Sequence, residues 1–209
     1  MPAGYVFSIW GLIYLALVAF VIYQVLPSQR ENDRFRRIGY WFAASCVANI
    51  AWLFFWHYQL FPLTLLAMLV LLACLIVVYL KLDIGRSQVS TIERWLVNFP
   101  FSLYLGWVSV ATIANVTSLL DYLGWGGWGV PPQVWAVIML SVGVLLAGVV
   151  AVQRGDFIYV LVFIWAYIGI AAAQSDAPLV VFASWIGAVL LGLSLLMIAL
   201  RMWPISKRA

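Results

Sequence analysis

Charged side chains are scarce in this chain. Only 9% of its 209 residues are Asp, Glu, Lys or Arg, whereas 67% are hydrophobic, and the mean hydropathy is +1.08. A water-soluble domain of this length needs far more polar surface, so the composition excludes that class and indicates a membrane protein. We read the net charge of +4 as a topology signal and expect no nucleic-acid partner.

Residues that bind metals or transfer protons are also few. The chain has one histidine, His57, and two cysteines, Cys46 and Cys74, which lie inside apolar runs. A bis-histidine haem site is therefore excluded within one chain, and no Cys, His and carboxylate cluster has metal-ligand spacing. No Ser–His–Asp set can be assembled at one depth. We expect no catalytic residues, no metal site and no enzyme activity, and we interpret His57 as an interfacial residue or, alternatively, as a ligand to a tetrapyrrole metal.

Ionisable groups are missing from the interior of the apolar runs. The two lysines, Lys81 and Lys207, lie at the edge of a run and in the C-terminal tail, which excludes a retinal Schiff base inside a span. Proton and ion pumps place carboxylates at membrane depth, and no Asp or Glu lies within a run here. The sequence therefore argues against a rhodopsin-like protein and against ion-coupled transport.

The apolar runs themselves predict the fold. A helix needs about 20 apolar residues to cross a bilayer, and an open strand in lipid leaves backbone groups unpaired. We predict an all-α, polytopic membrane helix bundle with seven transmembrane helices. The predicted spans are Tyr5–Leu26, Ile38–Trp56, Pro62–Leu82, Trp95–Leu120, Val134–Gln153, Phe157–Ala173 and Leu179–Leu200.

Proline and glycine mark the boundaries between these spans. Asp121–Pro132 is a turn-rich connector, and the Arg154–Asp156 turn predicts that the fifth and sixth spans form an antiparallel hairpin. Pro100 lies one turn inside the fourth span, where it predicts a kink.

The distribution of Lys and Arg predicts the orientation. All 11 basic residues lie in alternate connectors or in the C-terminal tail, at positions Arg30, Arg34, Arg36, Arg37, Lys81, Arg86, Arg94, Arg154, Arg201, Lys207 and Arg208. Because basic loops are retained on the cytoplasmic side, we predict that the N-terminus is outside and the C-terminus cytoplasmic. We expect the protein in the bacterial inner membrane.

Aromatic residues are abundant, with 12 Trp, 10 Tyr and 12 Phe. Interfacial belts account for those near the span ends, among them Trp41, Trp95 and Trp203 inside and Trp56, Trp125, Trp128 and Trp135 outside. Five tryptophans lie deeper within spans, where they either pack helices together or line a ligand pocket. These are Trp10, Trp52, Trp107, Trp165 and Trp185.

Helical spacing gathers several of these residues on common faces. The first face carries Phe7, Trp10 and Tyr14, the second Ser45, Asn49, Trp52 and Trp56, and the third Tyr104, Trp107, Ala111 and Asn115. Chain direction places all three faces in the outer half of the bilayer. Because an unpaired amide is costly in hydrocarbon, Asn49 and Asn115 need partners. We therefore predict an outward-facing, aromatic-lined cavity that suits a flat, apolar, conjugated ligand.

Three motifs carry a family resemblance. They are Val6–Tyr14 (VFSIWGLIY), Asn49–Phe55 (NIAWLFF) and Pro100–Asn115 (PFSLYLGWVSVATIAN). In this order they resemble the Trp…Leu-Tyr, Asn-x-x-Trp-x-x-Phe-Phe and Pro-Tyr-x-x-Trp-x-x-x-Ala-x-x-x-Asn helices of the TspO/MBR family, the tryptophan-rich sensory or translocator proteins. The third motif has three extra residues between its proline and its tryptophan. The resemblance covers residues 5–119.

The chain departs from that family pattern in several places. The family core has five helices, and the chain begins where the second one begins, so we interpret it as an extended form that lacks the first helix. Ser8 replaces a family proline, and the sterol-recognition pattern is absent after Asn115; the formal match Val77–Lys81 is weak evidence. The resemblance therefore implies tetrapyrrole binding more than cholesterol binding.

Three regions are expected from this reading. Residues 1–119 form a TspO-like four-helix portion, 120–133 a Gly/Trp-rich external connector, and 134–209 three additional transmembrane helices with a basic tail. The additional helices carry small residues at helical spacing, Gly143, Ala147 and Ala151 on one and Ser184, Ala188 and Gly192 on another. Such faces allow close helix packing, either within the chain or against a partner subunit.

The leading functional hypothesis is a non-catalytic membrane binding or sensor protein. Its ligand-binding residues would be Phe7, Trp10, Tyr14, Asn49, Trp52, Trp56, Tyr104, Trp107 and Asn115, with Trp165, Tyr167 and Trp185 as a possible cavity wall. No cofactor is obligatory, and a tetrapyrrole, carotenoid or lipid would be bound. A homodimer or a larger complex is compatible with this reading. The alternatives are an accessory subunit of a pigment-bearing photosynthetic or respiratory complex, a small-molecule transporter and a porphyrin-degrading enzyme.

Overall fold

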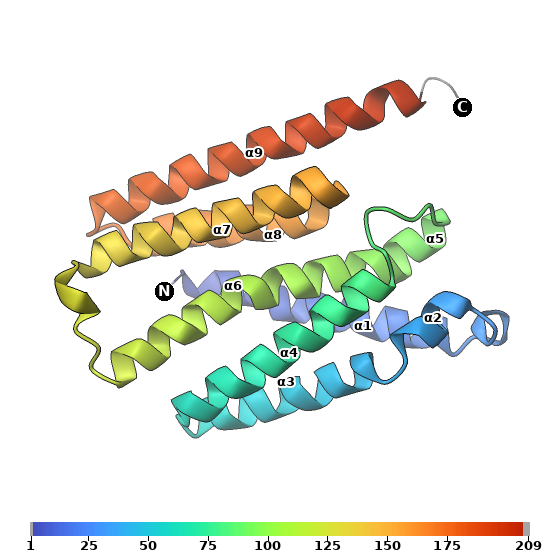
Figure 1. The fold of residues 1–209 in the computed structure, drawn as a ribbon, viewed down its shortest axis with the longest axis horizontal. Coiled ribbons are helices and arrows are strands. Elements are labelled where there is room, and N and C mark those ends of the chain that lie inside the picture. The colour runs from blue at the N-terminus through green and yellow to red at the C-terminus, as the bar shows by residue number, and fades with distance from the viewer. Residues whose placement is uncertain (1, 207–209) are drawn as a thin grey trace. The chain divides into compact units, whose positions relative to one another are not determined.

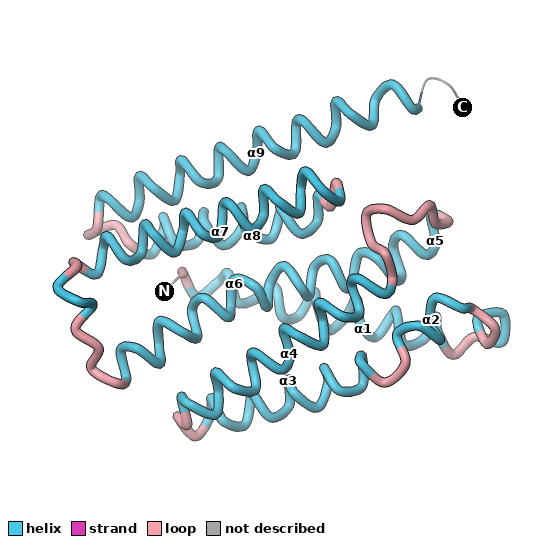
Figure 2. Tube along the Cα trace, in the orientation of Figure 1, coloured by secondary structure: helices cyan, strands magenta, loops and turns pink. Residues whose placement is uncertain are grey.

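The structure is a computed structural model that describes residues 2–206, with side chains described up to Leu200. Arg201, Trp203, Lys207 and Arg208, which carried part of the orientation and belt predictions, lie outside the residues whose side chains are described. The described regular elements are all helical (Figures 1 and 2). The main helices are α1 (Ile9–Gln24), α3 (Trp41–His57), α4 (Phe61–Lys81), α6 (Phe99–Tyr122), α7 (Pro132–Arg154), α8 (Phe157–Ala173) and α9 (Pro178–Ser206). Two short helices, α2 (Asp33–Ile38) and α5 (Thr91–Glu93), lie in connectors, and a 3-10 segment, η1 (Gly4–Ser8), leads into α1.

The structure confirms the predicted fold class, which is an all-α bundle with several apolar helices. Among the residues that the structure describes, five helical stretches have the length and hydropathy of membrane spans, namely Gly4–Gln24, Phe61–Lys81, Thr91–Tyr122, Pro132–Arg154 and Pro178–Leu200. The remaining two apolar helices, Trp41–His57 and Phe157–Ala173, have 17 residues each. Seventeen residues span about 25 Å, which is the lower limit for crossing a bilayer core. The count of seven spans therefore stays a prediction, as does the orientation.

Local sequence explains where these helices begin and end. Pro62 and Pro132 occupy the first turns of α4 and α7, where the missing N–H is not needed. Gly155 ends α7 in the left-handed region with φ of 61°, and the Asp156 side chain accepts a hydrogen bond from the Tyr159 N–H at the start of α8. The predicted turn between α7 and α8 thus has a glycine C-cap followed directly by an aspartate N-cap.

The fourth predicted span contains a wider helical turn next to Pro100. Residues Arg94–Asn98 form a π-helical segment, η3, between α5 and α6, and the Phe99 N–H bonds to the Arg94 carbonyl. A proline removes one backbone donor and crowds the carbonyl of the preceding turn. The wide turn provides the local adjustment that such a position needs, in place of a break in the helix.

Residues Ile9–Trp125 form one compact unit. Within it α3 packs along α4, α4 along α6, and α1 along α6. Helices α3 and α4 are an antiparallel pair joined by Tyr58–Leu60, where Gln59 has a positive φ of 57°. This arrangement brings the predicted aromatic faces of α3 and α6 into the same unit as Trp10 and Tyr14 of α1, whereas Phe7, predicted on the same face as these two, lies in η1.

The other compact unit consists of Met1–Ser8 and Gly126–Ala209. Its helices α7, α8 and α9 pack against one another, and the small residues Gly143, Ala147, Ala151, Ser184 and Ala188 are buried. Tyr167 fills the space that Gly143 and Gly187 leave, and its hydroxyl donates to the Leu140 carbonyl at 2.5 Å. These five small residues are therefore used for packing inside this unit, whereas a Cβ atom at Gly192, the sixth residue of the two predicted faces, would meet nothing within 4 Å.

The N-terminal segment belongs to this second unit because it lies on α8. The Ala3 N–H donates to the Gly169 carbonyl at 2.9 Å, and the Trp165 indole N–H donates to the Val6 carbonyl at 3.2 Å. Val6 is fully buried, and a Cβ atom at Gly169 would overlap its Cγ2. The sequence placed residues 1–8 with the first portion, whereas in the structure they pack with the last three helices.

Candidate functional site

The described structure brings together an aromatic cluster in the Ile9–Trp125 unit. The Trp10 ring stacks on Tyr14 and on Trp52, with centroids 5.5 Å apart in both pairs. The same ring contacts Tyr104 edge-on at 6.0 Å and Trp107 edge-on at 6.3 Å. We call these five residues the ring cluster. Trp10 is its centre, because it contacts each of the other four rings.

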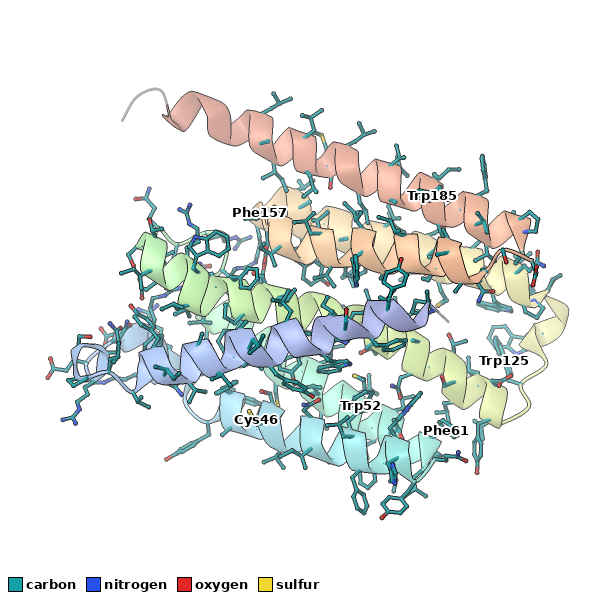
Figure 3. The ribbon with its side chains drawn as sticks, turned by 180° about the vertical axis from the view of Figure 1, so that it is seen from behind. Cys46, Trp52, Phe61, Trp125, Phe157 and Trp185 are labelled. Atoms are coloured by element: carbon teal, nitrogen blue, oxygen red, sulfur yellow. The ribbon has the colours of Figure 1, made fainter. Side chains whose placement is uncertain are left out.

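Three helices build the ring cluster from residues spaced along one face. Trp10 and Tyr14 are four positions apart on α1, and Tyr104 and Trp107 are three apart on α6, so each pair lies on one helix surface. Trp52 points from α3 toward α1 (Figure 3). Tyr104 and Trp107 are each only 1% exposed, so their rings are interior. The periodic faces predicted from the sequence therefore do meet.

Polar atoms lie within the ring cluster and are incompletely paired. The Asn49 amide nitrogen donates to the Tyr14 hydroxyl at 3.1 Å. The Asn49 Oδ1 atom and the Trp52 Nε1 atom are buried without a hydrogen-bond partner, and their residues are 7% and 9% exposed. A buried donor or acceptor without a partner costs about 1–3 kcal/mol. On α3 an unused acceptor and an unused donor thus lie three positions apart.

The rings touch one another instead of lining open space. Centroid distances of 5.5–6.3 Å are those of direct stacked and edge-to-face contact. Such distances leave no room for a third ring between Trp10 and its neighbours. A planar ligand can therefore enter between Trp10 and the rings that it contacts only after these rings move apart.

Two other predicted binding residues, Trp56 and Asn115, belong to this unit. Trp56 is one helical turn from Trp52 and contacts it at 6.0 Å, and it also meets the Phe61 ring at 5.8 Å. Phe61 in turn contacts Tyr122 at 5.1 Å, so these three rings mark one end of the unit. Asn115 lies on α6 and is 5% exposed. His57, at the C-terminal end of α3, is exposed and has its ring against Tyr58.

The remaining predicted site residues belong to the other unit. Phe7 is in η1 and is 43% exposed. Trp165 contacts Tyr5 and Val6, Tyr167 is buried between α7 and α9, and Trp185 is exposed on α9 (Figure 3). Their contribution to a cavity wall stays a prediction.

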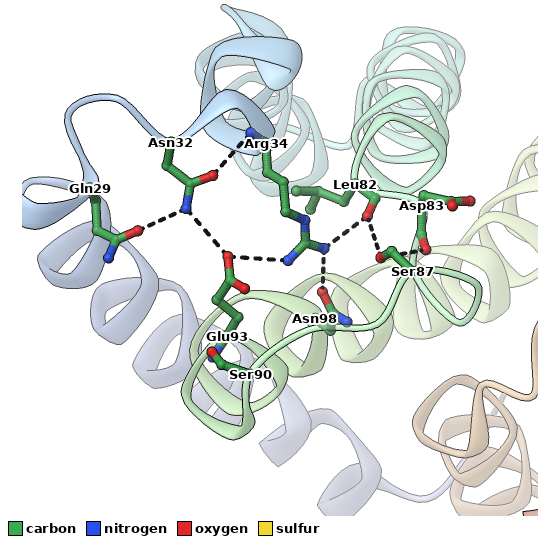
Figure 4. A network of polar contacts seen from close by, with 9 residues as sticks. All are labelled: Gln29, Asn32, Arg34, Leu82, Asp83, Ser87, Ser90, Glu93 and Asn98. Atoms are coloured by element: carbon green, nitrogen blue, oxygen red, sulfur yellow. Dashed lines mark hydrogen bonds and ion pairs between the residues drawn. The ribbon is translucent and has the colours of Figure 1, made fainter.

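Sequence reasoning missed a polar network at the other end of the Ile9–Trp125 unit (Figure 4). Arg34 forms an ion pair with Glu93 at 3.4 Å and donates to the Leu82 carbonyl at 2.8 Å and to Asn98 Oδ1 at 3.0 Å. The Asn32 amide donates to Glu93 Oε1 at 3.3 Å and to Gln29 Oε1 at 2.8 Å. Except for the Asn32–Gln29 bond, these contacts join residues more than 40 positions apart, so no local sequence pattern predicts them.

The network also shows that the basic connectors of this unit meet. Residues 29–38, 82–87 and 90–98 are held together through Arg34, and four of the first segment's residues are arginines. The opposite end, with Trp56, Phe61 and Tyr122, has no basic residue in its connectors apart from His57. This charge asymmetry is the arrangement that the predicted orientation requires.

Comparison with known proteins gives one match. The family model described as TSPO-like protein matches residues 1–197. The match therefore includes the first 20 residues of α9 and reaches well beyond the three motifs, which end at Asn115. No curated protein and no solved structure matches the chain.

Proposed function

Since the chain belongs to the TSPO-like protein family and is an integral multi-pass membrane protein, we propose that it binds a flat, conjugated, apolar ligand at the ring cluster. The ligand class is a tetrapyrrole or a similar pigment or lipid. The role is that of a non-catalytic binding or sensor protein. Aromatic faces attract planar π-systems through stacking and through removal of apolar surface from water or lipid headgroups.

The observation that carries this proposal is the pair of unused polar atoms among stacked rings. Asn49 Oδ1 accepts a hydrogen bond and Trp52 Nε1–H donates one, and both are buried without a partner. A tetrapyrrole with carboxyl side chains offers both complements, because a carboxylate oxygen accepts from Trp52 Nε1–H and a protonated carboxyl group donates to Asn49 Oδ1. When such a ligand is bound, its polar groups would supply the hydrogen bonds that the two atoms lack, which favours the bound state.

Binding in this scheme begins with a change at Trp10. This ring is the central member of the cluster and belongs to α1, the helix that carries the partly exposed Tyr14. When Trp10 turns away, the faces of Trp52 and Trp107 become available to a planar molecule. The ring of Trp10 then stacks on the free face of the ligand. The site works by stacking and hydrogen bonding, and no step requires a proton or electron transfer.

The small-residue faces of α7 and α9 do not support the accessory-subunit alternative. Gly143, Ala147 and Ala151 on α7 and Ser184 and Ala188 on α9 are buried inside their own unit. The feature that suggested a docking surface for a partner is therefore already used within the chain.

Titration of the purified protein with protoporphyrin tests the proposal. Tryptophan fluorescence, corrected for absorption by the porphyrin, should be quenched with saturation. Trp10→Ala and Trp52→Ala should each weaken binding at least tenfold, whereas Trp128→Ala, at an 82% exposed position in the connector, is the matched control. Quenching without saturation, or the same affinity in all three variants, would refute a site at the ring cluster.

A further inference from the structure

Six basic side chains are exposed at the end of the Ile9–Trp125 unit where its polar connectors meet. We call this surface the basic end; it consists of Arg30, Arg36, Arg37, Lys81, Arg86 and Arg94. Each of them lies within three positions of a member of the Arg34 network, which contains Asn32, Leu82, Ser87 and Glu93 (Figure 4). The network therefore gathers six cations from three separate segments onto one side of the unit.

The network also fixes the backbone that carries these cations. Arg34 is bound at once to Glu93, to the Leu82 carbonyl and to Asn98, and its side chain is only 18% exposed. The Ser87 hydroxyl donates to the Asp83 carbonyl at 3.1 Å, and the Ser90 hydroxyl caps the Glu93 N–H at 3.2 Å. The connectors are thus held by side-chain hydrogen bonds, so the exposed arginines project from an ordered platform.

Positive charge remains in excess at this surface. Glu93 is occupied by Arg34 and Asn32 inside the network. The other acids of these segments are Glu31, Asp33 and Asp83, and the six exposed cations outnumber them two to one. At the opposite end of the same unit, Asp121 and His57 are the titratable side chains of the connectors besides Tyr58 and Tyr122. The excess is therefore local to one end.

Exposed apolar and aromatic side chains border these cations in the sequence. Leu80 precedes Lys81, Ile92 and Trp95 flank Arg94, and Tyr40 and Trp41 follow Arg37. All five are exposed, and Tyr40 reaches 90%. A binding site for a water-soluble anion does not need exposed apolar side chains next to its cations. A molecule that joins a negative headgroup to apolar chains fits both parts, because the chains can lie along the exposed faces of the helices.

We propose that the basic end is a binding site for an anionic phospholipid. The phosphodiester and any further negative charge of the headgroup lie against Arg36, Arg37 and Arg94, and the acyl chains run beside Trp41 and Trp95. Each arginine or lysine near a negatively charged membrane surface favours binding roughly fivefold. This inference does not depend on a ligand at the ring cluster, which is built from other residues.

The test uses the full chain in nanodiscs of mixed phosphatidylglycerol and phosphatidylcholine. Lipids that stay with the protein after transfer to mild detergent are counted by native mass spectrometry. Phosphatidylglycerol should be enriched over its share of the nanodisc. In Arg36→Gln/Arg37→Gln the enrichment should fall about tenfold or more, whereas Arg36→Lys/Arg37→Lys, which keeps both charges, should retain most of it.

Three outcomes would overturn the proposal. The first is an absence of phosphatidylglycerol enrichment in the unaltered chain. The second is equal enrichment in Arg36→Gln/Arg37→Gln and in Arg36→Lys/Arg37→Lys. The third is release of phosphatidylglycerol by millimolar glycerophosphoglycerol, which has the headgroup without chains and would indicate a site for a soluble phosphate ester. If the glutamine variant does not fold, the salt dependence of binding is the test. Enrichment in the unaltered chain must then decrease when the salt concentration is raised from about 0.05 to 0.5 M.

Discussion

The indoles of Trp10 and Trp52 stack with centroids 5.5 Å apart and ring planes 27° apart, although Trp10 lies on α1 and Trp52 on α3. This contact places the Trp10 ring against the residue that carries the unpaired Nε1 atom. The same tryptophan is thus part of the packing of the unit and the donor that a ligand would use. Ligand binding and stability of the empty protein should therefore respond in opposite directions to loss of the indole N–H.

Trp52→Phe tests this directly, because phenylalanine keeps an aromatic ring and removes the N–H. We expect affinity for protoporphyrin to fall about 3- to 10-fold, the effect of one hydrogen bond. The ligand-free protein should have the same or higher thermal stability, since the variant no longer buries an unpaired donor. Binding is measured by fluorescence quenching and stability by thermal unfolding in one detergent.

Trp128→Phe is the control for loss of an indole N–H at an exposed position. If Trp52→Phe lowered the stability of the ligand-free protein by more than about 1 kcal/mol without changing affinity, the N–H would have a structural partner and no role toward a ligand.

Gly143→Ala should destabilise the unit of α7, α8 and α9 by about 1–3 kcal/mol, because its Cβ would overlap the Tyr167 hydroxyl. The next contacts of that Cβ, to Phe163 and to the Tyr167 ring, are both at 3.4 Å and need little adjustment. Removal of the hydroxyl in Tyr167→Phe should therefore relieve most of the clash. Unfolding of the two single variants and of the double variant gives the coupling energy.

Gly148→Ala is the matched control on the same helix, since a Cβ there would meet nothing within 4 Å. Additive effects of Gly143→Ala and Tyr167→Phe would show that the hydroxyl is not the atom that excludes a side chain at position 143.

Gly169→Ala should release the N-terminal segment from α8. Its Cβ would overlap Val6 Cγ2, and the Ala3 N–H would lose its bond to the Gly169 carbonyl when the segment moves away. Hydrogen–deuterium exchange of a peptide covering residues 3–8 should become at least tenfold faster, while that of α9 stays the same. Val6→Ala in the same chain should restore part of the protection, and unchanged exchange in Gly169→Ala would contradict this docking.

The predicted orientation can be tested with single cysteines in a chain that carries Cys46→Ser and Cys74→Ala. Gly126→Cys and Ser175→Cys should react with a membrane-impermeant maleimide in intact bacterial cells. Ser28→Cys, at the basic end, should react only after the membrane has been permeabilised. The opposite labelling pattern would place the basic connectors outside and reverse the topology.

The sequence by itself determined the helical class and most of the helix bounds. Phe157–Ala173 is predicted and observed with the same ends, because a glycine C-cap, an aspartate N-cap and an apolar run are all local signals. It also determined which residues share a helix face within α1, α3 and α6, since periodicity of 3.6 is a property of the chain alone. Phe7 is the exception, because it lies in the 3-10 segment before α1 and not on the face of Trp10 and Tyr14. The π-helical segment at Arg94–Asn98 shows the limit of such signals. Pro100 predicted a kink near this position, but the surrounding helix determined that the irregularity is a wide turn.

Only the tertiary structure decided which faces meet and which polar atoms stay unpaired. The Trp10–Trp52 stack, the Asn49–Tyr14 hydrogen bond and the Arg34–Glu93 ion pair each join segments far apart in sequence, and no local pattern specifies such partners. Packing likewise assigned the small-residue faces of α7 and α9 to the interior of their own unit and placed Val6 on Gly169. The physical reason is that periodicity fixes the direction of a side chain from its helix axis, whereas steric fit between whole helices selects its neighbour.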